Sequence, residues 1–326
     1  MSYTKSVFLP VTPDEAFDLV TQPERLRRWM TIAARIDLRA AGDFRWTVVP
    51  GAHAKGTVIE VEPGRRVTFA WGWEGNEEVP PGSSEVTITL EPAEGGTSLT
   101  LVHAGLDAEQ EAMHAEGWNH YLGRLVALAE GADAGLDVWG MPEGFDQVKG
   151  AEASWAVLSR VLTAVDSGSL SLPTPCEDFD VAALTEHLRG SIASIGAALG
   201  ASIPEDDDDA PTEARLAAVI EPTLEAFARR GLAGDVDMGF AILPAALVAN
   251  ILNLELLVHA WDFSTAIGLP LDVSAEISDY VLGLAQSTIT DQIRANGSFA
   301  PEKLVDESAH ALDRLVAFTG RVPARG

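Results

Sequence analysis

The sequence predicts two domains: an α+β domain with an antiparallel sheet around a long C-terminal helix, followed by an all-helical bundle. Its 326 residues are about twice the usual domain size of ~150 residues. Apolar residues alternate with a period of two between about residues 36 and 103, and with a helical period after residue 145. Residues 131–144 are rich in Gly, Asp and Pro and follow neither period. We therefore place the domains at residues 1–140 and 145–326.

The first domain should begin with a strand at residues 5–9 and a helix directly after it. Thr12, Pro13 and Glu15 are typical of a helix N-terminus, with a hydroxyl cap, proline in the first turn and glutamate three residues after the cap. Five alternating runs then follow, separated by Pro- and Gly-rich turns, and predict an antiparallel meander with one buried face. A long helix over about residues 107–130 completes the domain.

These elements carry the motifs of a known superfamily. The motifs are Leu26-Arg-Arg-Trp29, Gly42-Asp-Phe-Arg-Trp46, Gly56-Thr-Val-Ile-Glu60, Thr68-Phe-Ala-Trp71, the run from Gly96 to His103, and Gly117-Trp118. Residues 1–140 thereby resemble the START-like (SRPBCC) superfamily, in the branch named for homologues of the activator of heat-shock-protein-90 ATPase. The resemblance implies a helix-grip fold with a ligand cavity between the curved sheet and the long helix. It does not identify a ligand or a chaperone partner, because this fold has many functions.

Aromatic residues of the strands and the long helix are the candidate lining of that cavity. The set, with one histidine at the end of an apolar strand, is Phe44, Trp46, Phe69, Trp71, Trp73, His103 and Trp118. Large rings around a hollow bind apolar small molecules. The alternative is a closed core filled by the same rings, in which His103 is a core histidine with satisfied hydrogen bonds.

The second half has a helical period throughout, and Asp180 is a suitable N-cap for its second helix. Helices are expected at about residues 148–165, 180–199, 212–230, 245–266, 274–294 and 307–318. Long helices with modest connections predict a bundle. The helix at 245–266 is apolar nearly all round, so we expect it to be buried within that bundle.

The buried helix carries Glu255, His259 and Asp262, whose spacing of i, i+4 and i+7 places them on one stripe. A buried charge without a partner is costly, and a metal ion is one possible partner. His187, on the helix at 180–199, has small residues on its flank that leave room for an ion. Two histidines and one carboxylate bind Zn²⁺, Fe²⁺ or Ni²⁺ with positions left open. The alternative is a metal-free core in which these histidines only make hydrogen bonds.

Spacing alone does not distinguish this helix from two others. Glu116 and His120, and likewise Asp306 and His310, have the same i, i+4 spacing. The residues beside those two pairs are less apolar. Expected burial therefore favours the helix at 245–266 as the site of metal ligands.

The second half also carries motifs of a known family. They are Thr174-Pro-Cys-Glu-Asp-Phe-Asp-Val181, Leu184-Thr-Glu-His187, Glu255-Leu-Leu-Val-His259-Ala-Trp-Asp262, and the closing run from Leu312 to Pro323. Residues from about 146 to the end resemble actinobacterial metal-binding proteins related to mycothiol-dependent maleylpyruvate isomerase, within the DinB-like group. The resemblance implies a four-helix bundle whose divalent metal, zinc before nickel or iron, is bound by His187, Glu255 and His259. It implies that Asp262 orients a ligand, that mycothiol is a possible cosubstrate, and that a homodimer is a possible assembly.

Two functions are compatible with these motifs. One is a metal- and thiol-dependent transferase or isomerase acting on a small electrophile. The isomerase reaction itself is not expected, because that enzyme has an additional C-terminal domain, whereas this chain ends soon after the bundle and has another domain in front. The alternative is a non-catalytic small-molecule binding or stress-response protein with a metal-stabilised bundle.

The composition argues against several classes of partner. The formal net charge is −27, with 22 basic and 49 acidic residues. Without a cluster of Lys and Arg, we expect neither nucleic-acid binding nor attachment to an anionic membrane. The single cysteine cannot form an intrachain disulfide, and the N-terminus lacks the apolar core of a signal peptide. These features predict a cytoplasmic protein whose partner is a small-molecule ligand or substrate.

Overall fold

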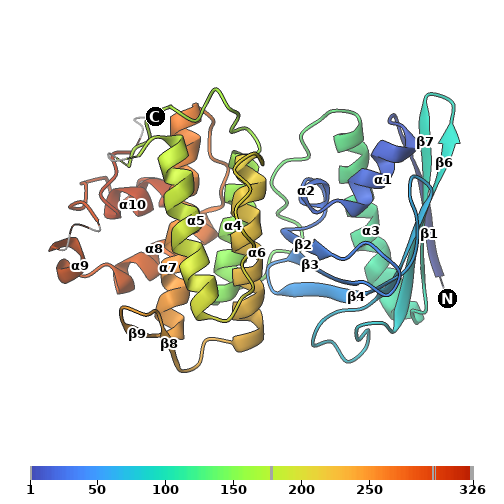
Figure 1. Ribbon diagram of the computed structural model, residues 1–326, viewed down its shortest axis with the longest axis horizontal. Helices are drawn as coiled ribbons and strands as arrows, with labels where there is room; N and C mark the ends of the chain where they lie inside the picture. Colours follow the sequence, from blue (N-terminus) through green and yellow to red (C-terminus); the bar gives the residue numbers. More distant parts are fainter. Residues whose placement is uncertain (1, 177–178, 296, 298, 324–326) are drawn as a thin grey trace. The chain divides into compact units, whose positions relative to one another are not determined.

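The computed structural model describes residues 2–176, 179–295, 297 and 299–323 (Figure 1). The chain forms two compact units, Met1–Met141 and Pro142–Gly326. The division falls inside the segment whose composition indicated a linker.

The first unit is built on a seven-stranded antiparallel sheet with the order β1-β7-β6-β5-β4-β3-β2. The strands are β1 (Ser2–Leu9), β2 (Ala33–Ile36), β3 (Asp43–Val49), β4 (Ala52–Glu62), β5 (Arg66–Trp71), β6 (Ser84–Ala93) and β7 (Gly96–Ala104). Strands β2 to β7 are neighbours in chain order, as expected for a meander. The first strand pairs with the last, so that Ser2 lies opposite Ala104.

Three helices accompany the sheet: α1 (Pro13–Thr21), α2 (Pro23–Leu26) and α3 (Ala108–Ala129). The Thr12 hydroxyl caps α1 by accepting a hydrogen bond from the Glu15 backbone N–H, as the motif predicted. Asp107 caps α3 in the same way. In Figure 1 the helices lie on one face of the strongly curved sheet. This arrangement has the features of the expected α+β helix-grip fold.

One close approach between strands explains a glycine in the sheet. A side chain at Gly56 on β4 would meet the Ala70 carbonyl oxygen of β5 at 1.7 Å. The register of this strand pair shifts between Val58 and Glu60. Glycine at position 56 thus permits the sharp curvature of the sheet.

The core of the first unit is aromatic where the sheet faces its helices. Phe44, Trp46, Phe69 and Trp71 are each at most 2% exposed. Five pairs of these rings have centroids 4.9 to 5.7 Å apart, all in tilted or edge-to-face contacts. Such contacts stabilise a core beyond the burial of apolar area alone.

The second unit is helical, with a small two-stranded sheet. Its helices are α4 (Gln147–Leu162), α5 (Val181–Ala198), α6 (Thr212–Arg230), α7 (Ala245–Ile267), α8 (Ala275–Thr288), α9 (Asp291–Ala295) and α10 (Ala311–Phe318). Helix α4 packs against α6 and α7, and α5 packs against the same two helices. Helix α7 is long and apolar enough to span a membrane, but 72% of its most apolar stretch is buried inside the protein. It therefore has the character of a core helix.

The first unit has one strand that was not expected, β2, and the second unit differs from the sequence expectation in three places. The expected helix at 274–294 is interrupted after Thr288, where Ile289 is extended and the Thr290 hydroxyl caps the next helix. Three consecutive β-branched residues favour this break. Helix α10 begins at Ala311 and not at residue 307, because Asp306 accepts hydrogen bonds from Ser308 in a turn. The hairpin of β8 (Asp235–Asp237) and β9 (Ile242–Pro244) was not foreseen.

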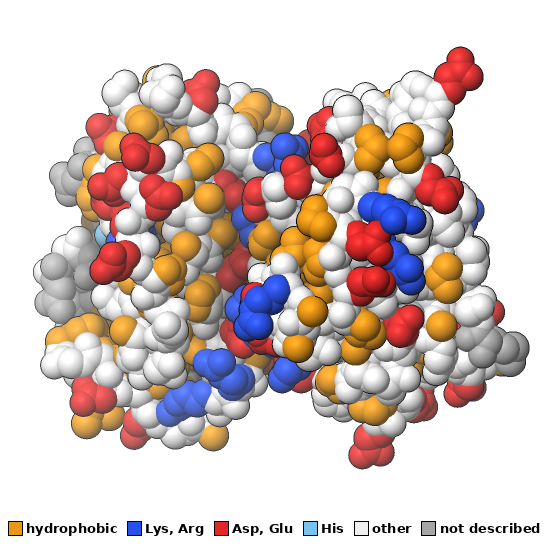
Figure 2. All heavy atoms as spheres, turned by 45° about the vertical axis from the view of Figure 1, so that its right-hand side comes forward, with side chains coloured by type: hydrophobic (Ala, Val, Ile, Leu, Met, Phe, Trp, Pro, Cys, Tyr) orange, Lys and Arg blue, Asp and Glu red, His pale blue; other side chains and the backbone are white. Residues whose placement is uncertain are grey.

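Acidic side chains are spread over the face drawn in Figure 2, and basic side chains form small groups among them. Several basic residues of the first unit are paired locally. Arg35 lies 2.5 Å from Asp43, and Arg66 lies 3.4 Å from Glu60. Both pairs are exposed to solvent, so their main effect is on local charge and not on stability.

Candidate functional site

The second unit brings together the three residues expected to bind a metal. Helix α5 contributes His187, and α7 contributes Glu255 and His259. One potential ligand atom from each residue lies within 4.8 Å of the other two. The Glu255 Oε2 atom is 3.5 Å from His187 Nε2 and 3.4 Å from His259 Nε2. The three side chains thus converge on one point.

The Glu255 carboxylate is the unusual member of this cluster. Its Oε2 atom is buried and has no hydrogen-bond partner among the described residues. The two imidazole nitrogens facing it are farther away than a normal hydrogen bond of 2.7–3.2 Å. A buried carboxylate oxygen without a hydrogen bond is costly unless another partner is present. Two imidazole nitrogens and one carboxylate oxygen fit the ligand preferences of zinc, nickel and iron.

A second layer of hydrogen bonds holds His259 in place. Its Nδ1 atom lies 2.8 Å from Asp262 Oδ2. Arg321 in turn donates to both carboxylate oxygens of Asp262, at 2.7 and 2.6 Å. With Nδ1–H directed at Asp262, the His259 Nε2 atom faces Glu255. A histidine that binds a metal usually has such a partner on its other nitrogen.

Charges within the cluster shift the titration of its members. Burial disfavours the charged form of His259, but the hydrogen bond to Asp262 and the nearby Glu255 carboxylate outweigh burial and raise the pKa of His259 to about 9. Burial also opposes ionisation of Glu255, but His187 and His259 hold the pKa of its carboxyl far below the usual range. These shifts favour a protonated His259 beside an ionised Glu255. A metal ion at Nε2 would replace the proton on that atom.

Exposure decreases through the cluster from one side to the other. The side chain of His187 is 37% exposed, that of Glu255 is 18%, and that of His259 is 9%. Phe179 stacks on the His187 ring with a centroid distance of 5.1 Å. The cluster is therefore open to solvent beside His187, and small molecules can approach from that side.

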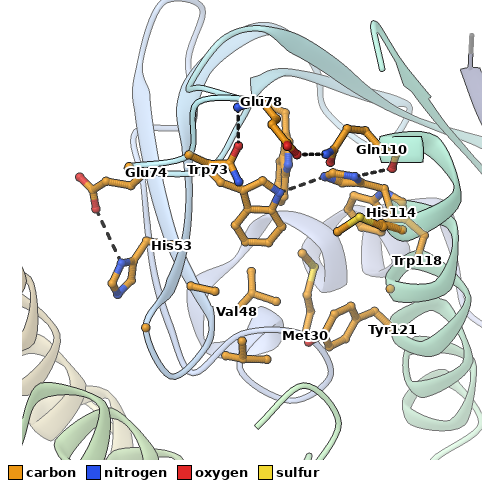
Figure 3. A pocket seen from close by; sticks show the side chains of 18 of the residues that line it. Met30, Val48, His53, Trp73, Glu74, Glu78, Gln110, His114, Trp118 and Tyr121 are labelled. Carbon is orange, nitrogen blue, oxygen red and sulfur yellow. Dashed lines mark hydrogen bonds and ion pairs between the residues drawn. The ribbon is translucent and has the colours of Figure 1, made fainter. Parts of the chain in front are cut away.

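The first unit contains a separate cavity of about 460 Å³ (Figure 3). Its walls come from strands β3 to β5, the loop after β5, helix α3 and the segment near Trp139. Figure 3 shows Val48 and Met30 facing Tyr121 across the hollow, while Trp73 and His114 meet at another side. A cavity of this volume holds a small organic molecule.

The aromatic residues predicted to line this cavity fall into two groups. Trp71, Trp73 and Trp118 lie along it. The structure places Phe44, Trp46, Phe69 and His103 in the packed core and not among the lining residues. Phe44 and Trp46 pack against Trp71 with centroid distances of 5.7 and 5.6 Å. Both alternatives drawn from the sequence thus apply, each to part of the aromatic set.

Sequence reasoning missed several lining residues. His114 and Tyr121 lie four residues before and three residues after Trp118 on α3, and Trp139 lies in the segment regarded as a linker. The spacing i, i+4, i+7 from His114 to Tyr121 is the pattern that identified the stripe on α7. Applied to α3, the same pattern indicates these two positions.

The two histidines near the cavity accept hydrogen bonds from tryptophan side chains and are held neutral by burial. Trp118 donates its indole N–H to His103 Nδ1 at 3.0 Å, and Trp73 donates to His114 Nε2 at 2.9 Å. His103 Nε2–H then donates to Ser84 Oγ, and His114 Nδ1–H donates to the Gln110 carbonyl oxygen. Burial, with His114 nearby, lowers the pKa of His103 to about 3, and burial also lowers the pKa of His114. The nitrogens of both rings are therefore already in hydrogen bonds.

Comparisons with known proteins identify relatives of this chain. A family model described as activator of Hsp90 ATPase homolog 1-like protein matches residues 10–130, from the end of β1 to the end of α3. An AHSA1-like protein from Rhizobium etli is 40% identical, covering 44% of this chain and 91% of that one, with a TM-score of 0.37. CalU16 from Micromonospora echinospora is 30% identical, covering 39% and 75%, with a TM-score of 0.34. An uncharacterized protein of Mycobacterium tuberculosis is 28% identical over 166 residues, which are 50% of this chain and 91% of that one.

Proposed function

Residues 10–130 belong to the activator of Hsp90 ATPase homolog 1-like family, and from this premise we propose a small-molecule-binding protein whose helical domain binds a divalent metal ion. The observation that carries the metal proposal is the buried Oε2 atom of Glu255, which faces the Nε2 atoms of His187 and His259 without a hydrogen bond. Zinc is the first candidate and nickel or iron the alternatives, because all three accept this ligand set.

The residues around the cluster would have distinct roles in such a centre. His187, Glu255 and His259 would hold the ion, and Asp262 would keep His259 in the tautomer that presents Nε2. Arg321 neutralises the Asp262 carboxylate, so that this second layer adds little net negative charge. Three protein ligands leave at least one position for an exchangeable molecule, whereas structural zinc sites are usually closed by four.

We extend the proposal to a thiol such as mycothiol as the exchangeable molecule, within a bundle of the DinB-like kind. A bound divalent ion favours the thiolate form of a coordinating thiol. The open side beside His187 supports this extension, since a thiol of low molecular weight needs access from solvent. A metal- and thiol-dependent transferase or isomerase acting on a small electrophile would use such a centre.

The metal proposal is tested by elemental analysis of the purified full chain. We expect about one Zn, Ni or Fe per chain, and loss of the metal in a His187→Ala/His259→Ala double variant. His310→Ala is the matched control, because His310 is an exposed histidine of the same domain. Absence of metal from wild-type protein, even after incubation with each ion, would contradict the proposal. Equal metal content in wild type and double variant would show that the ion binds elsewhere.

A second function is favoured by the cavity of the first domain, which has a volume of about 460 Å³. We propose that this domain binds an apolar small molecule. Small-molecule binding by the first domain does not depend on whether the helical bundle is catalytic. Its test is saturable quenching of tryptophan fluorescence by an uncharged aromatic probe such as fluorene, since Trp71, Trp73 and Trp118 line the cavity. Quenching that does not saturate would contradict specific binding.

A further inference from the structure

One wall of the cavity contains a hydrogen-bond donor without a partner. Tyr121 is 4% exposed and lines the cavity. Its hydroxyl makes no hydrogen bond to any described residue. Figure 3 shows its ring projecting from α3 toward Met30 and Val48. Buried hydroxyl groups are nearly always paired in folded proteins, so this one requires an explanation.

Most of the other polar groups nearby already have hydrogen-bond partners. Trp73 donates to His114, and His114 uses its other nitrogen on the Gln110 carbonyl oxygen. Gln110 also donates its side-chain amide to Glu78. Among the described lining residues, the buried side-chain atoms without a hydrogen bond are the Tyr121 hydroxyl and the indole nitrogen of Trp71. Both groups can donate a hydrogen bond, and the indole N–H can only donate. A ligand that pairs with them must therefore supply a hydrogen-bond acceptor.

The protonation state of Tyr121 is consistent with a donor role. Burial raises the pKa of its hydroxyl, and the nearby Asp137 carboxylate raises it further. The hydroxyl therefore keeps its proton throughout the physiological pH range. It can supply one hydrogen bond to an oxygen or nitrogen acceptor inside the cavity.

The charge of the lining restricts the ligand further. The described residues that line the cavity include two carboxylates, Glu74 and Glu78, but no lysine or arginine. Glu74 is paired with Arg45 at 2.9 Å and Lys55 at 3.4 Å, outside the lining. A carboxylate or phosphate ligand would therefore find no free cation in the lining and would meet the Glu78 carboxylate. This arrangement favours an uncharged ligand.

From these observations we infer that the cavity binds an uncharged aromatic molecule with a carbonyl-type oxygen, and that the Tyr121 hydroxyl donates a hydrogen bond to that oxygen. The aromatic character follows from Trp71, Trp73 and Trp118, which present rings to the ligand. This inference rests on the proposed function of the cavity as a small-molecule site. It adds the chemical class of the ligand and the residue that recognises it.

The test compares two probes of nearly the same shape on the full chain. Fluorenone carries one carbonyl oxygen, and fluorene is the hydrocarbon without it. Dissociation constants are measured by quenching of tryptophan fluorescence for wild type, Tyr121→Phe and Tyr3→Phe. Tyr3→Phe is the matched control, because the Tyr3 hydroxyl donates to Asn119 at 3.0 Å and does not line the cavity.

We expect Tyr121→Phe to weaken fluorenone binding about three- to tenfold, as for one neutral hydrogen bond, and to leave fluorene binding unchanged. The ratio of the two affinities, compared between variants, is independent of the different solubilities of the probes. Tyr3→Phe should keep the wild-type ratio. Unchanged fluorene binding by Tyr121→Phe also shows that the variant is folded around an intact cavity.

Two other outcomes have separate meanings. If both probes bind and Tyr121→Phe has the wild-type ratio, the inferred role of Tyr121 is overturned while the cavity remains a small-molecule site. If neither probe binds wild type, the proposed function of the cavity fails, and the inference fails with it.

Discussion

The two domains bury histidines in opposite ways. In the first domain, indole N–H groups donate to His103 and His114, and the pKa of each imidazole is lowered. In the second domain, carboxylates face His259, and its pKa is raised to about 9. Burial disfavours the charged ring in both places, so the neighbouring groups make the difference. The first domain thus keeps its buried histidines neutral, and the second surrounds a buried histidine with carboxylates.

The largest expected effect comes from breaking the charged cluster behind His259. Replacing Asp262 by Ala would leave the Arg321 guanidinium, whose side chain is 10% exposed, without its carboxylate partner. We expect a loss of about 3–5 kcal/mol in the free energy of unfolding of the helical domain. Urea denaturation followed by far-UV circular dichroism measures this loss.

Asp279→Ala provides the control, because Asp279 pairs with Arg314 and both side chains are more exposed, at 51% and 33%. That change should cost at most about 1 kcal/mol. Equal losses in the two variants would show that burial of the Asp262–Arg321 pair does not matter for stability.

A smaller loss of stability is expected on acidification, when the buried neutral histidines of the first domain become protonated. His103 has a folded pKa of about 3 against an ordinary value of 6.5, so the unfolded chain binds a proton first as the pH falls. The stability contributed by the neutral ring is complete above pH 6.5 and is lost as the pH falls toward 3. Between pH 6.5 and 4 we expect this group to cost on the order of 3 kcal/mol.

The measurement is urea unfolding at several pH values, followed by tryptophan fluorescence, since most of the eight tryptophans lie in the first domain. A His103→Gln variant is the reference, because an amide can accept from Trp118 and donate to Ser84 without titrating. The acid sensitivity of wild type should exceed that of the variant. Identical pH profiles would indicate that His103 is not the responsive group.

The smallest expected change in stability tests the cavity itself. Gly117 lies on α3 and lines the cavity, and a side chain there would make an ordinary contact of 3.5 Å with Trp139. Gly117→Leu should fill part of the cavity and weaken fluorene binding at least tenfold. It should also stabilise the helix by about 0.5–1 kcal/mol, because glycine is a poor helix former.

Gly123→Leu is the matched control for this prediction. Gly123 lies on the same helix, is exposed, and has open space around the position of an added side chain. This variant should gain similar helix stability and keep full fluorene affinity. Weakened binding in both variants would mean that the probe does not occupy the described cavity.

Local sequence patterns were sufficient to predict most of the elements. Period-two alternation predicted the strands of the meander, and the caps at Thr12 and Asp180 marked the starts of α1 and α5. The spacing of Glu255, His259 and Asp262 placed them on one stripe of α7. These properties depend on residues within one or two turns or strands of each other, so the sequence contains them directly.

The interruption at Ile289 shows where local reasoning was incomplete. The helical period continues across residues 274–294, but the chain leaves the helix after Thr288 and restarts at Thr290. A Thr-Ile-Thr run signals such a break through low helix propensity and a capping hydroxyl. The prediction of one continuous helix followed the apolar period and did not take this signal into account.

The sequence by itself determined the two fold classes and the shared helix face of Glu255, His259 and Asp262 on α7. It also determined that the first domain is rich in aromatic residues. Only the tertiary structure decided which rings face the cavity: Phe44 and Trp46 pack against Trp71, and of these three rings Trp71 alone lines the cavity. It also decided that Arg321 binds Asp262 across 59 positions of the chain, and that Tyr121 has no described hydrogen-bond partner. Such contacts depend on how distant elements pack, and packing is a property of the whole fold that no local period contains.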